Sequence, residues 1–502
     1  MSPAVTEAFA RVPDLAAQHL LLAMCALALA IVLSLPLGVV AARRPGVGRV
    51  VLGVAGLVQT IPSLALLALF YPVLLWIGGL PALGFLPALL ALTLYALLPI
   101  VRNLATGLTG LDPALIEAAD GVGMTAAQKL RLVEAPLVLP LVMAGIRTAA
   151  VWTIGAATLS TTVGQPSLGD LIFAGLQTQA WTLVIAGCVS AAALALAVDA
   201  LLALAERGVA RRRPSWTWAA LGVLAAATVA ASAPLWSSGE KRVVIGAKNF
   251  SEQYILARLI GARLERAGYR VDYRDGLGSA VAFGAVAGGD VDAYVDYAGT
   301  IWAGEMKRTD VPPRAAQVAA IGDWAKRVRG VTLLGSLGFE NAYAFAMRPG
   351  AGIATLDDLA RAAPTLTLGS DLEFLDRPEW AAVRDAYGLR FAATTPYSPT
   401  FMYRALESGR ADVISAFSSD GRIAADGLTV LTDPKRAIPG YDAILLLSPR
   451  AAGDARIVAA LRPMIGRVPV EAMREANYMV DRDTDKRSPA VAAAWLAGKV
   501  GL

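Results

Sequence analysis

The sequence predicts a multi-domain protein, with an all-α membrane bundle followed by an α/β domain. First, no Asp, Glu, Lys or Arg occurs between Val50 and Val101, a run long enough for two membrane crossings. A helix needs roughly 20 apolar residues to cross about 30 Å of hydrocarbon. Second, charged residues return from Gly239 onward, where apolar and polar segments alternate as in a soluble protein. One chain therefore carries a membrane part and a water-soluble part.

The membrane part is expected to hold about six helical spans. Gly78, Gly79 and Pro81 separate the second span from the third. The expected spans are 18–41, 50–77, 82–104, 136–160, 177–204 and 216–236. These limits give a transmembrane domain at 1–236, a linker at 237–241 and a second domain at 242–502. No basic segment precedes the first span, so we expect no cleavable signal peptide.

Positive side chains indicate which way the spans point. They follow the first span, lie between the third and fourth, and follow the fifth: Arg43, Arg44, Arg49, Arg102, Lys129, Arg131, Arg207, Arg211, Arg212 and Arg213. If the spans alternate, these segments share one side, which the positive-inside rule makes cytoplasmic. The opposite loops carry only Asp170. We therefore expect a multi-pass protein of the cell (inner) membrane whose 242–502 domain lies outside the cytoplasm, in the periplasm.

Composition narrows the possible functions. The net charge of +5 is spread over both parts without a dense basic block, so no nucleic-acid partner is expected. Both cysteines, Cys25 and Cys188, fall in apolar spans, and His19 is the only histidine. We expect no metal site, no cofactor and no catalytic residues, and therefore no enzyme. No G-x-x-x-x-G-K-[ST] phosphate loop occurs, so any ATP is handled by another chain.

The loop at 113–136 carries the first motif. Pro113 is expected to start a short helix, Gly121 and Gly123 permit a tight turn, and a second helix runs to Pro136. The loop resembles the EAA loop of ABC-transporter permeases. The matching residues are Glu117, Ala118, Ala119, Gly123 and Pro136. This resemblance implies a helical elbow that fits a groove of a separate ATPase, and an ordinary amphipathic loop between spans is the alternative.

The second domain alternates strands and helices. A strand is expected at 242–247, a helix from about 248 to 266, and further strands at 270–274 and 291–295. Gly276–Ser279 precedes another helix. This alternation is typical of an α/β domain with largely parallel sheets.

Four segments of this domain resemble the substrate-binding proteins of osmoprotectant importers for glycine betaine, choline or carnitine. They read Gly-Ala-Lys-Asn-Phe-Ser-Glu-Gln, Gly-Leu-Gly-Ser, Gly-Asp-Val-Asp-Ala-Tyr-Val-Asp-Tyr-Ala-Gly-Thr and Ser-Ser-Asp-Gly. With its permease half, the chain resembles the fused permease and binding-protein subunits of this group. The resemblance implies a type I importer permease, a two-lobed periplasmic binding domain, a separate ABC ATPase, a permease homodimer and contact with membrane lipid.

A quaternary ammonium ligand would require aromatic side chains. A trimethylammonium group donates no hydrogen bond, so ring faces and desolvation must hold it, at about 0.5–2 kcal/mol per cation–π contact. By resemblance the cage candidates are Tyr297, Tyr343, Tyr403 and Phe417, with Thr300 in the same motif as Tyr297. Each of these aromatic residues has a role in the hydrophobic core as its alternative.

The other end of such ligands is often a carboxylate. Main-chain N–H groups at the helix starts near Ser251 and Ser279 are candidates for binding it. Further candidates are Asn249, Gln253, Asn341 and Arg377. Asp420 either contacts the ligand or caps a helix, and both alternatives stay open.

Two functions remain from the sequence. The leading hypothesis is the membrane subunit of an ABC importer with its own binding domain. The alternative is a membrane-anchored receptor or sensor for a small cation, for which one span would suffice. The transported compound stays open among glycine betaine, choline, carnitine and a related betaine such as ergothioneine.

The arginine asymmetry makes a topological prediction. A reporter that is active only outside the cytoplasm should work when fused after Leu502 and fail when inserted at Ala126, because the elbow faces the cytoplasm. Reporter activity measured in cells checks this. Activity at Ala126 would overturn the predicted orientation.

Overall fold

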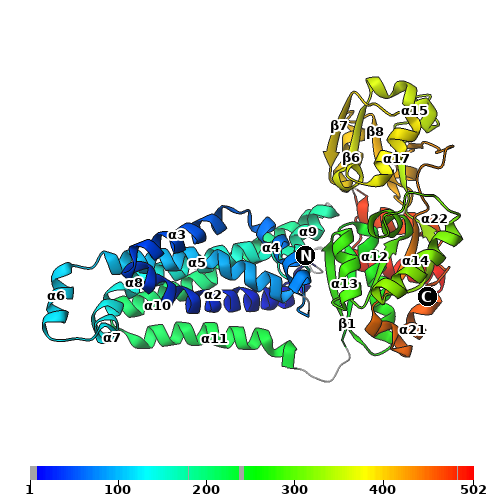
Figure 1. Ribbon diagram of the computed structural model, residues 1–502. Coiled ribbons are helices and arrows are strands. Elements are labelled where there is room, and N and C mark those ends of the chain that lie inside the picture. The colour runs from blue at the N-terminus through cyan, green and yellow to red at the C-terminus, as the bar shows by residue number, and fades with distance from the viewer. Residues whose placement is uncertain (1–7, 78, 179, 237–241, 483) are drawn as a thin grey trace. The chain divides into compact units, whose positions relative to one another are not determined.

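The computed structural model describes residues 8–77, 79–178, 180–236, 242–482 and 484–502 (Figure 1). Its chain divides into two compact units. Residues 1–172 with 182–238 form the first, here called the helical unit, and residues 173–181 with 239–502 form the second, the α/β unit. The predicted linker at 237–241 lies outside the described residues.

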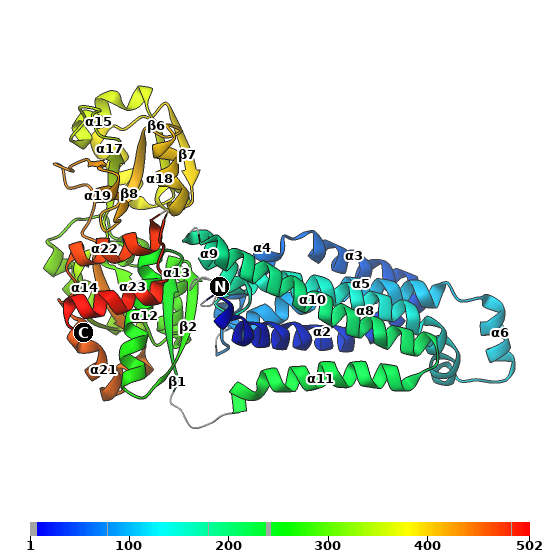
Figure 2. The ribbon, with the colours of Figure 1, turned by 180° about the vertical axis from the view of Figure 1, so that it is seen from behind.

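Within its described residues, the helical unit has five helices long and apolar enough to cross a membrane. They are α2 (Val12–Arg43), α5 (Phe85–Thr109), α8 (Ala135–Ala157), α10 (Trp181–Ala210) and α11 (Pro214–Trp236). They run side by side in Figure 1 and again from behind in Figure 2. The shorter α9 (Gly169–Gln177) precedes α10. Five of the predicted spans coincide with these helices to within a few residues.

The predicted span at 50–77 is wrong as one continuous helix. The chain forms α3 (Pro45–Thr60) and α4 (Ser63–Ile77), which are bent against each other by 102°. Between them the backbone of Ile61 is extended, with φ −69° and ψ 126°. The ring of Pro62 causes this, because it disfavours the helical conformation in the residue before it.

The bent pair still connects the two ends of the bundle. At one end Arg43, which closes α2 just before α3, forms an ion pair with the buried Glu134 of the 113–136 loop. At the other end Gly84, which follows α4, donates its N–H to the carbonyl of Val163 at 2.7 Å. The chain therefore passes from one end of the bundle to the other along α3 and α4.

The 113–136 loop forms a helical elbow at one end of the bundle (Figure 1). Its first helix α6 (Pro113–Gly121) begins at Asp112, whose carboxylate accepts the N–H of Ala114 at 2.9 Å. A turn follows in which Gly123 has φ +76°, the left-handed conformation that favours glycine. Lys129 pairs with Asp120 across this turn at 2.6 Å.

The second helix of the elbow does not end at Pro136 as predicted. Helix α7 (Ala126–Lys129) passes through a π-helical turn (Leu130–Glu134) directly into α8. Pro136 is the second residue of α8 and follows this π-helical turn directly. The elbow is therefore continuous with a membrane span.

Three charged side chains join α8 to α10. Arg147 donates from Nε and Nη2 to both carboxylate oxygens of Asp199 at 3.0 Å, and from Nη1 to Glu206 at 2.7 Å. This network satisfies the three charges together within a largely apolar bundle.

The α/β unit has two lobes, each built on its own five-stranded sheet (Figures 1 and 2). Lobe 1 has the strand order β2-β1-β3-β10-β4 and lobe 2 the order β7-β6-β8-β5-β9. The strands of lobe 1 are β1 (Arg242–Lys248), β2 (Arg270–Leu277), β3 (Ala293–Tyr297), β4 (Thr332–Glu340) and β10 (Asp442–Leu447). The strands of lobe 2 are β5 (Tyr343–Met347), β6 (Thr367–Asp371), β7 (Ala393–Tyr397), β8 (Val413–Phe417) and β9 (Thr429–Val430).

Helices surround both sheets and complete the hydrophobic core. In lobe 1 they are α12 (Ser251–Arg266), α13 (Ser279–Gly288), α14 (Arg314–Arg329), α20 (Pro449–Ala452), α21 (Ala455–Leu461), α22 (Val470–Asp481) and α23 (Pro489–Val500). In lobe 2 they are α15 (Leu356–Ala362), α16 (Leu372–Leu375), α17 (Pro378–Tyr387), α18 (Pro399–Glu407) and α19 (Arg422–Ala425). Fully buried side chains such as Ile245, Leu445 and Phe345 fill the space between helices and sheets.

The predicted alternation of strands and helices is confirmed, but the sheets are mixed, not largely parallel. In lobe 1, β10 runs antiparallel to both neighbours, and in lobe 2, β5 does the same. Both β5 and β10 come directly after the chain crosses over from the other lobe. They therefore start at the hinge, the side of each lobe where the chain crosses. Strands β1, β3 and β8 end on that side. The two crossings are tied together where Asn341 donates its N–H to the carbonyl of Tyr441 at 3.0 Å.

Candidate functional site

The candidate site lies where strands of both lobes end near the crossings. In lobe 1, β1 ends at Lys248 and leads through the exposed Asn249 to Phe250, which precedes α12, while β3 ends at Tyr297. Carboxyl ends of parallel strands and the helix starts that follow them are the usual ligand-binding edge of an α/β sheet. Thr300 lies beyond Tyr297 and is buried at the start of a π-helical turn.

A buried cation lies against the Tyr297 ring. The Lys248 ammonium forms an ion pair with Asp296, and both side chains are almost fully buried. Its Nζ is 5.3 Å from the centroid of the Tyr297 ring, within cation–π range. The ring predicted to hold a ligand cation therefore already contacts a cation of the chain.

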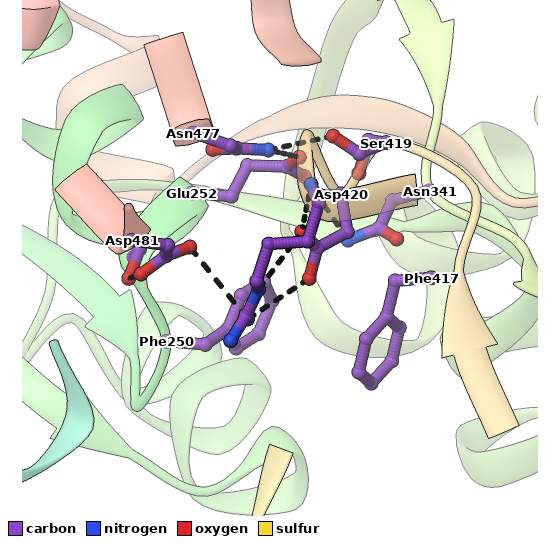
Figure 3. A pocket seen from close by; sticks show the side chains of 10 residues that line it. Phe250, Glu252, Asn341, Phe417, Ser419, Asp420, Asn477 and Asp481 are labelled. Atoms are coloured by element: carbon purple, nitrogen blue, oxygen red, sulfur yellow. Dashed lines mark hydrogen bonds and ion pairs between the residues drawn. The ribbon is translucent and has the colours of Figure 1, made fainter. Parts of the chain in front are cut away.

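The Tyr297 hydroxyl belongs to a buried network around Glu252. It donates to Glu252 Oε1 at 2.6 Å, and Asn341 Nδ2 donates to the same oxygen at 3.1 Å. Asn477 Nδ2 donates to Oε2 at 2.8 Å and also to the carbonyl of Ser419 at 2.9 Å. Figure 3 shows both amides directed toward the carboxyl group. Burial raises the pKa of Glu252, although these hydrogen bonds act in the opposite direction.

Gln253 lies beside the Glu252 network and links neighbouring elements by hydrogen bonds. Its Nε2 donates to the Tyr297 hydroxyl and to the carbonyl of Val295, both at 3.0 Å, and its Oε1 accepts the N–H of Lys248 at 3.2 Å. The amide predicted to bind a ligand thus connects α12 to β1 and β3.

Four aromatic rings form a continuous row from lobe 1 to lobe 2. Phe250 lies 6.1 Å from Tyr297 and 6.2 Å from Phe417, and Phe417 lies 5.2 Å from Tyr343, measured between ring centroids. Tyr343 and Phe417 are direct partners in the antiparallel pair of β5 and β8. Three of the four predicted cage residues therefore share one row, and Phe250 joins them.

Tyr403 and Asp420 have other partners. The Arg422 guanidinium lies 4.1 Å from the centroid of the Tyr403 ring. Asp420 accepts the backbone N–H of Arg422 at 2.9 Å at the start of α19 and also pairs with its guanidinium at 3.1 Å. The capping alternative for Asp420 is thus observed.

A small cavity lies between Phe250, Glu252, Asn341 and Phe417, with Asp420 also lining it (Figure 3). Its volume is about 30 Å³. At its edge Ser251 donates to the Asp481 carboxylate at 2.5 Å. Entry of a larger ligand therefore requires these side chains or the two lobes to move.

Two predicted carboxylate-binding residues meet across the lobes. Ser279, the first residue of α13 in lobe 1, donates from Oγ to Glu373 Oε1 of lobe 2 at 2.7 Å. Arg377 donates from Nη2 to the same oxygen at 2.5 Å, and its guanidinium lies 5.8 Å from the centroid of the Tyr343 ring. The structure thus brings Ser279 and Arg377 together on a carboxylate of the chain itself.

Comparison with protein families covers both units. A model described as the substrate binding domain of ABC-type glycine betaine transport system matches residues 241–498, more than half of the chain. A model described as binding-protein-dependent transport system inner membrane component matches residues 34–211.

Curated relatives match either nearly the whole chain or a part of it. The chain is 28% identical over 499 residues to an ergothioneine transport permease/ergothioneine binding protein of Helicobacter pylori (strain G27), covering 94% of this chain and 88% of that protein. It is 42% identical over 190 residues to a choline transport system permease protein of Bacillus subtilis (strain 168), covering 38% of this chain and 84% of that protein. A crystal structure of a glycine betaine/carnitine/choline ABC transporter is 27% identical, with a TM-score of 0.45, covering 51% of this chain and 98% of that one.

A helical membrane unit and a two-lobed α/β unit on one chain define a transport subunit that carries its own binding domain. The chain belongs to the betaine-type ABC importer family, as a fused permease and substrate-binding protein.

Sequence reasoning missed five residues that shape this site: Lys248, Phe250, Glu252, Glu373 and Asn477. The first three stand inside the quoted segment Gly-Ala-Lys-Asn-Phe-Ser-Glu-Gln, so the motif itself was a signal for them. Glu373 lies in no motif, and only its contact with Ser279 identifies it.

The Glu252 network predicts a pH-dependent stability. The folded chain holds the Glu252 proton more tightly than the unfolded chain does, so the bound proton contributes to the stability of the fold. This contribution to stability is complete below the ordinary pKa of 4.5 and is lost as the pH rises through the raised pKa of the folded chain. Glu252→Gln removes the titration. The thermal midpoint of the variant relative to the wild type, measured by calorimetry of the full chain from pH 4 to 8, should therefore rise with pH. A difference that stays constant would contradict the raised pKa.

Proposed function

We propose that this importer subunit takes up a quaternary ammonium compound, with glycine betaine, choline, carnitine and ergothioneine as the candidates. The row of rings formed by Tyr297, Phe250, Phe417 and Tyr343 carries the proposal, since such rings can bind a cation that donates no hydrogen bond. Lys248 lies near Tyr297 and Arg377 near Tyr343, so both rings already lie within about 6 Å of a positive charge of the chain.

We infer the rest of the assembly from the transporter family and from the elbow. A separate ABC ATPase drives transport, the permease unit pairs with a second copy of itself, and lipid surrounds its apolar helices. The elbow lies on the cytoplasmic side, and the α/β unit lies outside the cytoplasm. Apolar side chains exposed on the elbow, Leu115, Val122 and Leu132, support its docking in a groove of the ATPase.

Within the elbow the proposed coupling residues differ in exposure. Glu117, Ala118, Gly123 and Pro136 are exposed, so they are available to the ATPase, whereas Ala119 is buried and holds α6 in place. Because the elbow continues directly into α8, a displacement of α7 would be passed to the membrane span.

The ring row predicts how the ligand is recognised. Tyr343→Leu should weaken binding of the best ligand about 2- to 30-fold, the equivalent of one cation–π contact of roughly 0.5–2 kcal/mol. Tyr343→Phe keeps the ring and should change binding far less. The measurement is titration calorimetry on the full chain in lipid nanodiscs with each of the four candidate compounds.

An analogue with an uncharged tert-butyl head group provides the control for shape. In 3,3-dimethylbutanoate, a carbon replaces the quaternary nitrogen of glycine betaine without changing its outline. Weak binding of this analogue to the wild type is expected. Binding as tight as that of glycine betaine would rule out cation recognition by the rings.

The glycine turn predicts the effect of elbow substitutions on coupling. A Cβ at Gly121 or at Gly123 meets no atom within 4 Å, but only Gly123 has a positive φ. Gly123→Val should therefore strain the turn by roughly 1–3 kcal/mol and lower uptake and ligand-stimulated ATP hydrolysis about tenfold, while ligand binding stays intact. Gly121→Val is the matched control and should retain more activity. Equal activities of the two variants in proteoliposomes would contradict coupling through this turn.

A further inference from the structure

The donors predicted for the carboxylate of a ligand already hold a carboxylate of the chain. Ser279 belongs to lobe 1 and Arg377 to lobe 2, and both donate to Oε1 of Glu373, at 2.7 Å and 2.5 Å. Arg377 is about one-tenth exposed, whereas the Glu373 side chain is half exposed. The Glu373 carboxylate therefore bridges the two lobes while it remains half exposed.

The surroundings of Glu373 suit an anion. Ser279 is the first residue of α13, a helix of ten residues whose cap Gly278 offers no side-chain acceptor for the free N–H groups. Unpaired N–H groups and the helix dipole favour a negative charge at this end. Burial alone would raise the pKa of Glu373, but the charges of Arg377 and Lys248 and the hydrogen bonds from Ser279 and Arg377 lower it overall. Glu373 is therefore an ionised carboxylate at neutral pH.

A cation of the chain, Lys248, lies at one ring of the row, Tyr297. Lys248 lies against Tyr297 as a ligand ammonium would, and Glu373 lies on Ser279 and Arg377 as a ligand carboxylate would. If a zwitterionic betaine uses Ser279 and Arg377 for its carboxylate, that carboxylate must replace the one of Glu373. A ligand without a carboxylate has no such exchange to make.

We propose that Glu373 is an internal competitor for the carboxylate of the ligand, and that it thereby sets the preference between betaines with a carboxylate and quaternary amines without one. This inference rests on the proposed function, in which the ligand is a quaternary ammonium compound. Glu373 acts through Ser279 and Arg377, which makes it a specificity-determining residue that the ligand displaces.

The test compares glycine betaine, which has a carboxylate, with choline, which has none. In Glu373→Gln, the amide no longer repels the ligand carboxylate and binds Arg377 more weakly, because charged hydrogen bonds are about twice as strong as neutral ones. Binding of glycine betaine to the full chain in nanodiscs should tighten by about 2- to 5-fold, the range for a partly exposed ion pair. The dissociation constant for choline should change by less than about twofold.

Two further variants separate competition from a structural role. Asp376→Asn removes one negative charge from an exposed position three residues away, so the ratio of the two affinities should stay unchanged. Ser279→Ala combined with Glu373→Gln should lose the gain for glycine betaine, because one of the contested donors is missing. Glu373→Ala should shift the ratio in the same direction as Glu373→Gln and serves if the amide disturbs the fold.

The outcomes separate this inference from the proposed function. If both ligands bind the wild type and Glu373→Gln leaves their affinity ratio unchanged, or weakens both equally, the competitor role is wrong and the proposed function stands. If the wild type binds neither glycine betaine nor choline, and none of the other quaternary ammonium candidates, the proposed function fails and this inference fails with it.

Discussion

The buried carboxyl group of Glu252 is the contact on which the geometry of the candidate site depends. A carboxyl group removed from water must find hydrogen-bond donors within the protein. Here they come from three segments: Tyr297 at the end of β3, Asn341 in the first crossing, and Asn477 in α22. Because these donors all bind the Glu252 carboxyl group, they hold the start of α12 against both the crossing and the lobe 1 sheet. Phe250 directly precedes α12, so its ring is placed by the same constraint.

The direction of the strands at the crossings explains how the second half of the ring row arises. A strand that enters a lobe from the other lobe starts at the hinge, and it must run against neighbours that end there. In lobe 2 this places the first residue of β5, Tyr343, opposite the last residue of β8, Phe417. Residues opposite each other in an antiparallel pair lie close enough for their side chains to interact. The aromatic contact is therefore a consequence of chain topology.

Charges of the chain lie at several of the residues that we propose for ligand binding. Lys248 lies near the Tyr297 ring, and Glu373 binds both Ser279 and Arg377. The affinity of such a cleft reflects the difference between two sets of contacts, those made by the ligand and those made by the displaced side chains. Under the proposed function, the choice among similar betaines then depends on charged residues such as Lys248 and Glu373 as well as on the aromatic rings.

The sequence by itself determined five of the six membrane spans, the Gly123 turn of the elbow, and the α/β class of the second unit. These features follow from apolar length, glycine conformation and strand–helix alternation, which are properties of neighbouring residues. It also supplied the site segments, although the contributions of Phe250 and Glu252 within them went unrecognised. Tertiary structure decided the antiparallel β5 and β10 and the Ser279–Glu373 contact between residues 94 positions apart. Such contacts depend on how whole elements pack, and no local pattern records that packing.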